Sequence, residues 1–123
     1  THVAATLKAR GISCFWSHLS CHQGGVVICI RKSFLDKFDQ LSLNSVVKGR
    51  ILSISLINSC GKALQIVAVY FTTGQGPSPI NKEIDKVKTS LIKGYHHIVL
   101  GDFNFVLQEN DRSQGTVYGY EKA

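Results

Sequence analysis

Methionine is absent from all 123 residues, including position 1, so we expect the chain to be a piece of a longer protein. No apolar run approaches the roughly 18 residues that a membrane-spanning helix needs. The first residues, THVAATLKARG, also lack the apolar centre of a signal peptide. These absences leave export and membrane insertion without support.

Cysteine pairs with C-x-x-C spacing are also lacking. The chain has four cysteines, at positions 14, 21, 29 and 60. Without that spacing or a secretory context, free thiols are favoured over a disulfide framework. The segment HLSCH superficially resembles a set of zinc ligands, since it places His18, Cys21 and His22 within five residues. It follows a strand-like run and has no regularly spaced fourth ligand, so we interpret it as a surface loop.

Acidic residues are fewer than basic ones, with 8 Asp and Glu against 14 Lys and Arg, so the net charge is +6. A basic surface suits a polyanion such as nucleic acid, although many basic domains bind none. The hydrophobic share of 44% is typical of a folded chain. The length allows one domain at most, or part of a larger one.

Short runs rich in β-branched, aromatic and apolar residues predict the strands. Residues 12–17 and 25–32 read as neighbouring strands separated by a polar loop. Residues 50–59 alternate isoleucine and serine, which indicates a strand with one buried face. Residues 63–71 are almost continuously apolar, as in a strand covered on both faces. The short polar link between the last two predicts an antiparallel hairpin.

The second half of the chain predicts a strand, a helix and a strand. The Gly- and Pro-containing residues 72–79 are expected to form a loop. A helix should follow, capped by Asn81 and ending at Gly94, with Ile84, Val87 and Leu91 on its apolar face. Strand 96–101 then returns parallel to strand 63–71. Residues 33–44 fit a helical turn or an irregular crossing, and residues 113–123 show no consistent period.

Tyr70 and Asp102 end the two parallel strands, so we expect both at one rim of the sheet, where active sites of such folds collect. Asp102 could act as a general base or bind a metal, and Asn104, two residues on in extended backbone, should face the same side. Such a pair suits phosphate chemistry. Gly, Asp and Asn are also ordinary turn residues, so the four letters GDFN alone indicate a turn more often than a site.

Several motifs in order resemble the endonuclease/exonuclease/phosphatase superfamily. These are GR before a strand, a strand ending in Tyr70, and a strand ending in GDFN with DR shortly downstream. The chain is most similar to the endonuclease domain of non-LTR, LINE-like retrotransposons, whose QETH element would end at residues 1–2. The resemblance implies that residues 1–123 form an incomplete four-layered α/β sandwich, in which two mixed β-sheets are flanked by helices.

The resemblance also implies roles. Asp102 would orient or activate the attacking water close to a Mg²⁺ or Mn²⁺ ion, and Asn104 would contact the scissile phosphate. The Tyr70 hydroxyl would reach the phosphate or support the shell of metal ligands. Apart from the resemblance, Arg50 and Arg112 are candidates to contact the backbone of DNA. For Arg50, a structural role as a strand-start residue is the favoured alternative. Arg112 forms either an ion pair with Asp111 that shapes the loop or a solvated loop pair. The implied place of action is inside the cell, in the nucleus.

Departures from the family pattern limit these expectations. Thr72 stands where the family commonly has proline. The family's metal-binding glutamate would precede residue 1, and its late Asp–His pair would follow residue 123. We therefore expect the isolated chain to be a poor catalyst. A phosphatase or phosphodiesterase of the same superfamily, and a non-catalytic nucleic-acid-binding remnant, are the alternatives. We expect His96 and His97 at the end of their strand opposite the site.

Overall fold

The computed structural model describes residues 2–18, 20, 24–71 and 77–104, without the side chains of residues 77–80. Arg112, Asp111 and residues 113–123 therefore lie outside the described part. The elements are α1 (His2–Ala9), β1 (Ile12–His18), β2 (Gly25–Arg31), α2 (Lys32–Leu35), β3 (Gln40–Val47), β4 (Ile51–Ile57), β5 (Ala63–Tyr70), α3 (Pro77–Ser90) and β6 (His96–Asp102). No described helix has the length and apolar character to cross a membrane.

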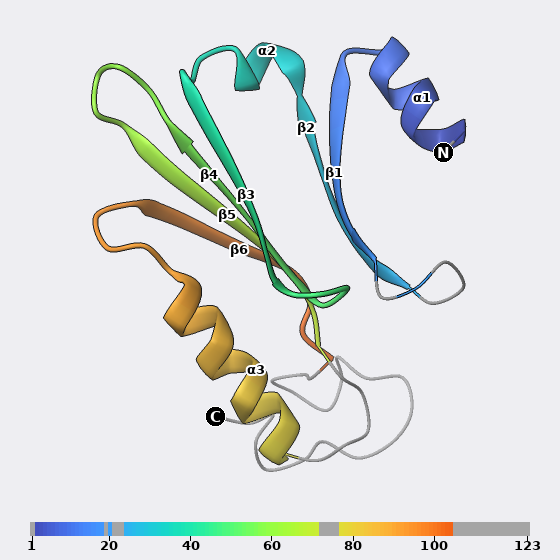
Figure 1. Cartoon of the computed structure of the whole chain (residues 1–123), viewed down its shortest axis with the longest axis vertical. Helices are drawn as coiled ribbons and strands as arrows, with labels where there is room; N and C mark the ends of the chain where they lie inside the picture. Colours follow the sequence, from blue (N-terminus) through green and yellow to red (C-terminus); the bar gives the residue numbers. More distant parts are fainter. Residues whose placement is uncertain (1, 19, 21–23, 72–76, 105–123) are drawn as a thin grey trace, which may run out of the picture.

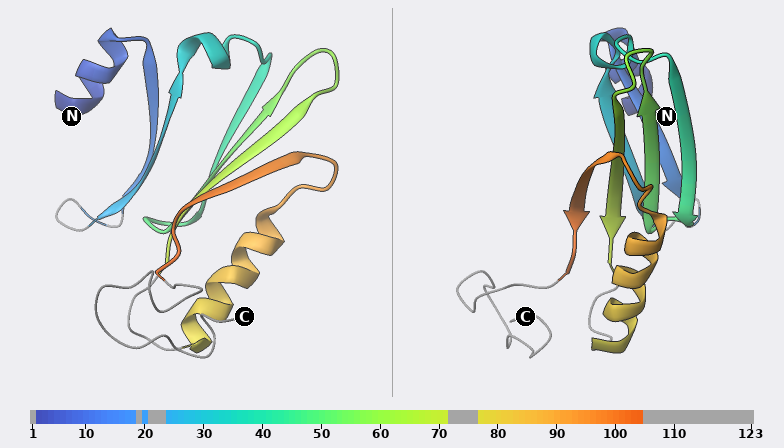
Figure 2. Two further views of the ribbon diagram at one scale, coloured as in Figure 1. Left: turned by 180° about the vertical axis from the view of Figure 1, so that it is seen from behind. Right: turned by 90° about the vertical axis from the view of Figure 1, so that its left-hand side faces the viewer.

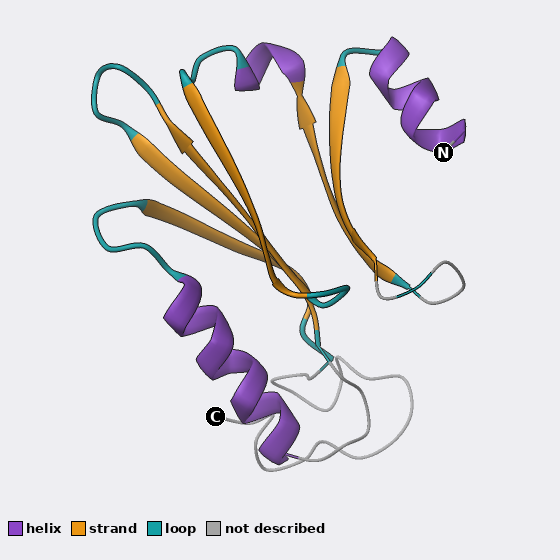
Figure 3. Ribbon diagram, viewed as in Figure 1, coloured by secondary structure: helices purple, strands orange, loops and turns teal. Residues whose placement is uncertain are grey.

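Two sheets face each other (Figure 1; Figure 3). Strands β1 and β2 form an antiparallel pair. The second sheet has the order β3-β4-β5-β6, in which only the β5–β6 pair is parallel. The predicted hairpin between β4 and β5 and the parallel return of β6 are thus confirmed.

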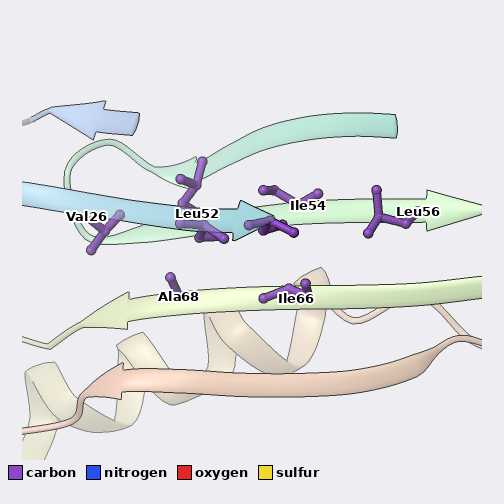
Figure 4. Close-up of a cluster of buried hydrophobic side chains, with 8 residues drawn as sticks. Val26, Leu52, Ile54, Leu56, Ile66 and Ala68 are labelled. Carbon is purple, nitrogen blue, oxygen red and sulfur yellow. The ribbon is translucent and has the colours of Figure 1, made fainter. Parts of the chain in front are cut away.

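The main core lies between the two sheets (Figure 4). Alternate residues of β2 are buried, which turns one face of this strand towards the second sheet. The buried members of this core are Val26, Ile28, Ile30, Leu52, Ile54, Leu56, Ile66 and Ala68. Strand β5 is buried on both faces, as its continuous apolar run predicts.

A second core lies on the other face of β4 and β5, where helix α3 covers the sheet. Val67, Val69 and Phe71 pack there with Val87 of the helix. Gln65 is buried on the same face. Its amide nitrogen donates to the Ser53 hydroxyl at 2.8 Å and to the carbonyl oxygen of Ser90, the last residue of α3, at 2.9 Å. This side chain fixes the point where the chain leaves α3 and turns towards β6.

The layers follow one another as α1, the β1–β2 sheet, the β3–β6 sheet and α3 (Figure 2). This arrangement confirms the predicted α/β class, with two sheets and helices outside. Both edge strands of the larger sheet expose apolar side chains: Leu41 and Leu43 on β3, and Ile98 and Leu100 on β6. The edges of this sheet therefore carry exposed apolar surface.

One prediction about local structure was confirmed only in part, and two were wrong. Residues 33–44 include most of the predicted helical turn, as the short helix α2, but they also contain most of strand β3, because the Leu-Ser-Leu alternation from Leu41 outweighs the three- and four-residue spacing of the phenylalanines. Helix α3 begins at Pro77, so residues 77–79 are helical and not a loop, and Asn81 does not cap the helix. Proline is tolerated in the first turn of a helix, because the N–H groups there lack intrahelical partners. The helix also ends at Ser90, and Gly94 lies in the following turn.

Candidate functional site

The ends of β5 and β6 bring Tyr70 and Asp102 together. The two residues are direct partners in the parallel register, so their side chains leave the sheet on the same face. The backbone N–H of Phe71 donates to the carbonyl oxygen of Asp102 at 2.9 Å, which extends the pairing one residue further. Both side chains are exposed, Tyr70 by 37%. The structure thus places both at one accessible rim, as the strand order predicts.

Gly101 makes this close approach possible. Its φ is +134°, a conformation that residues with a side chain rarely adopt. A Cβ atom here would overlap the carbonyl oxygen of Val69 and lie 2.9 Å from the Val69 nitrogen. Only glycine lets β6 lie against β5 at this point, immediately before Asp102. The glycine of GDFN therefore has a steric function that the sequence alone did not assign to it.

Asn104 corrects one expectation. Its backbone is left-handed, with φ of 54°, so the predicted extended geometry from Asp102 to Asn104 is wrong. The chain turns because Oδ1 of Asp102 accepts a hydrogen bond from the Asn104 N–H at 2.9 Å. The Asn104 carboxamide nitrogen donates to the carbonyl oxygen of Phe71, at the end of the neighbouring strand. Asn104 thus ties the two strand ends together and is half-buried at the same rim.

Arg50 also lies at this rim, against Tyr70. Its guanidinium carbon is 4.9 Å from the centre of the Tyr70 ring, within the range of a cation–π interaction. The backbone N–H of Tyr70 donates to the Arg50 carbonyl oxygen at 2.7 Å, and Nη1 of Arg50 approaches the Tyr70 carbonyl oxygen at 3.5 Å. Of the two roles left open for Arg50, the structure shows the structural one; contact with nucleic acid stays a prediction.

A serine network that sequence reasoning missed supports the turn before Arg50. The buried Ser17 hydroxyl of β1 lies 2.7 Å from the Ser45 hydroxyl of β3 and accepts the Gly49 N–H at 2.8 Å. It links the two sheets next to the rim. No spacing or periodicity distinguishes these serines from exposed ones, so only the three-dimensional structure reveals them.

The described rim provides only some of the ligands that a divalent ion needs. Asp102 offers a hard carboxylate oxygen of the kind that Mg²⁺ binds. Within residues 2–18, 20, 24–71 and 77–104, however, no three His, Cys, Asp or Glu side chains cluster as metal ligands. The described rim by itself therefore does not fit a protein-built metal site. Cys21 and His22 of the HLSCH segment lie outside the described residues, as does Arg112.

Other predicted positions lie away from the rim. His96 and His97 are exposed at the start of β6, opposite Asp102, and His97 Nε2 is 2.9 Å from the Ile92 carbonyl oxygen. A cavity of about 640 Å³ also opens at that end, where Asp39 and Tyr95 contribute to its walls. The predicted catalytic side chains lie at the other end of the sheet, so the rim is the candidate functional site.

Comparison with known proteins supports the fold. No protein-family model matches the chain, and no curated protein matches it. Among solved structures, it is similar to ANGEL2, described as a 2′,3′-cyclic phosphatase, with a TM-score of 0.62 and 16% sequence identity. The match covers 86% of this chain and 36% of ANGEL2. The chain therefore shares the fold of ANGEL2 while spanning about a third of its length.

Proposed function

We propose that the chain is part of a phosphoester hydrolase, and specifically of an endonuclease that nicks DNA in the manner of non-LTR retrotransposon endonucleases. The observation that carries the proposal is the pairing of Tyr70 and Asp102 on one accessible face of two parallel strand ends. The fold similarity to a phosphatase supports phosphoester chemistry. The net charge of +6 favours a polyanionic substrate over a small one.

The described side chains suggest a division of roles. Oδ1 of Asp102 is held by the Asn104 N–H, which fixes the carboxylate so that its second oxygen can orient or deprotonate a water molecule. The Tyr70 hydroxyl can donate to a phosphate oxygen, while the Arg50 guanidinium on the ring adds positive charge beside it. Asn104 uses one amide hydrogen on Phe71 and has a second for the phosphate.

Dependence on Mg²⁺ or Mn²⁺ is part of the proposal, because proteins of the resembled superfamily use such an ion to polarise the phosphate. The described rim supplies one carboxylate and no cluster of ligands. The remaining ligands would have to come from beyond the described residues, from water or from the substrate.

A second candidate is a phosphatase or phosphodiesterase acting on a small or terminal phosphate. The similarity to ANGEL2, a 2′,3′-cyclic phosphatase by its description, favours this alternative. A non-catalytic nucleic-acid-binding remnant is the third possibility. It shares the basic charge with the nuclease proposal but predicts binding without hydrolysis.

The test compares two substrates, supercoiled plasmid and a nucleoside 2′,3′-cyclic phosphate, using the complete protein that contains this chain, with Mg²⁺ and with a chelator. We expect plasmid nicking that the chelator abolishes. Asp102→Asn keeps the oxygen that accepts the Asn104 N–H, so it should preserve the fold and lower nicking about 100-fold or more. Asp85→Asn, on the exposed face of α3, is the matched control.

Three results would redirect the proposal. Hydrolysis of the cyclic phosphate without nicking would favour the phosphatase. DNA binding without hydrolysis of either substrate would favour the remnant. Equal nicking by the wild type and Asp102→Asn would remove Asp102 from its proposed role.

A further inference from the structure

Two cysteines of the smaller sheet face each other across its strands. Cys14 of β1 and Cys29 of β2 are direct partners in the antiparallel register, and their sulfur atoms are 3.4 Å apart. Directly opposed residues in antiparallel strands have Cα atoms about 4.5 or 5.5 Å apart, and both separations fall within the range that a disulfide bridges. The sulfurs need to approach by only about 1.3 Å to reach bonding distance.

The pair is open to small reagents. Cys29 is exposed and Cys14 is half-buried, and both are free thiols. Although the residue as a whole is exposed, partial burial of its sulfur, followed by the hydrogen bond and charge of Cys14, raises the pKa of Cys29. Either sulfur can donate the hydrogen bond between them, so either cysteine can be the first nucleophile. Cys60, the other described cysteine, lies in the turn between β4 and β5, in the other sheet.

We propose that Cys14 and Cys29 form a thiol-oxidation site, at which a low-molecular-weight disulfide such as oxidised glutathione converts the pair to a cross-strand disulfide. The thiolate of one cysteine attacks one sulfur of the oxidant, forms a mixed disulfide and expels one small thiolate. The thiolate of the other cysteine then attacks the protein sulfur of the mixed disulfide and expels the second. The protein loses two electrons and two protons, and the oxidant becomes two small thiols.

The bond would reinforce a weak part of the fold. A two-stranded sheet is marginally stable without further support, and β1 and β2 have no other strand partner among the described residues. A link between positions 15 residues apart restricts the unfolded chain. Oxidation should therefore raise the midpoint of thermal unfolding by about 5–10 °C.

The experiment uses the full chain with Cys21→Ser and Cys60→Ser, which keeps only the facing pair. After treatment with oxidised glutathione at mildly alkaline pH, we expect a monomer that has lost two hydrogens in intact mass and contains a Cys14–Cys29 linked peptide. Dithiothreitol should reverse both changes. The matched control, Cys21→Ser with Cys29→Ser, keeps Cys14 and Cys60 and should instead carry separate glutathione adducts.

Circular dichroism of both variants establishes that they are folded before oxidation. The proposal is overturned if the Cys14–Cys29 variant collects glutathione adducts or intermolecular dimers, or stays reduced while the control reacts. The same reaction in denaturing urea should give a ratio of internal disulfide to adduct at least 10-fold lower, because the register that aligns the thiols is lost. An unchanged ratio in urea would show that the native strand pairing contributes nothing to the formation of the disulfide.

Discussion

Replacing Gly101 by alanine tests whether the close approach of β6 to β5 creates the rim. At φ of +134°, an alanine is strained by about 1–3 kcal/mol. Its Cβ would also overlap the backbone of Val69, and relieving that overlap by shifting the strands should cost about 1–3 kcal/mol more. We therefore expect Gly101→Ala to lower the free energy of unfolding by about 2–6 kcal/mol.

Gly94→Ala is the matched control, because Gly94 also has a positive φ, of +88°, but a Cβ there would meet nothing within 4 Å. It should cost only about 1–2 kcal/mol. Urea unfolding followed by circular dichroism measures both variants. Hydrogen exchange at the Phe71 amide, which donates to Asp102, should quicken in Gly101→Ala alone. Equal stability of the two variants would refute the steric argument.

Two further predictions concern the support of the site. The side-chain oxygen of Gln65 accepts a hydrogen bond from the N–H of Ile92 at 2.8 Å, and Gln65→Leu leaves that N–H without its partner. The free energy of unfolding in urea should fall by about 2–4 kcal/mol. Ser53→Ala removes only one hydroxyl from the same network and should lower it by about 1 kcal/mol. A Gln65→Leu effect no larger than that of Ser53→Ala would contradict this account. Arg50→Ala should lower the free energy of unfolding by about 0.5–1 kcal/mol, because the contact with the Tyr70 ring is lost. A double-mutant cycle with Tyr70→Leu should give a coupling energy of the same size. Zero coupling would show that the stacking contributes nothing to stability.

The sequence predicted those parts of the fold that periodicity encodes strongly. The alternation in 50–59 and the apolar run in 63–71 could be read directly as strands. The alternation was wrong about burial, because β4 is buried on both faces and not on one: its serines, such as Ser53, are covered as well. Strand β3 was missed because its leucines, such as Leu43, are exposed at an edge and overlap a helix-like spacing. Helix α1 was missed because its eight residues carry no buried stripe.

The site was predictable to the extent that topology determines it. The order strand, helix, parallel strand places Tyr70 and Asp102 at the same end of the sheet, whatever the packing of the individual side chains. The orientation of Asn104 depends on an Asx turn, and the position of Arg50 depends on a ring that lies next to it only in the folded state. Such contacts between residues distant in sequence leave no local pattern to read.

The most direct test of the rim is an NMR titration of the chain with a short DNA duplex, which needs no catalytic activity. The account predicts that the largest chemical-shift changes occur at the amides of Tyr70, Asp102 and Asn104 and weaken as salt is added. Shifts concentrated instead around Asp39 and Tyr95, at the opposite end of the sheet, or spread evenly over the surface, would contradict it.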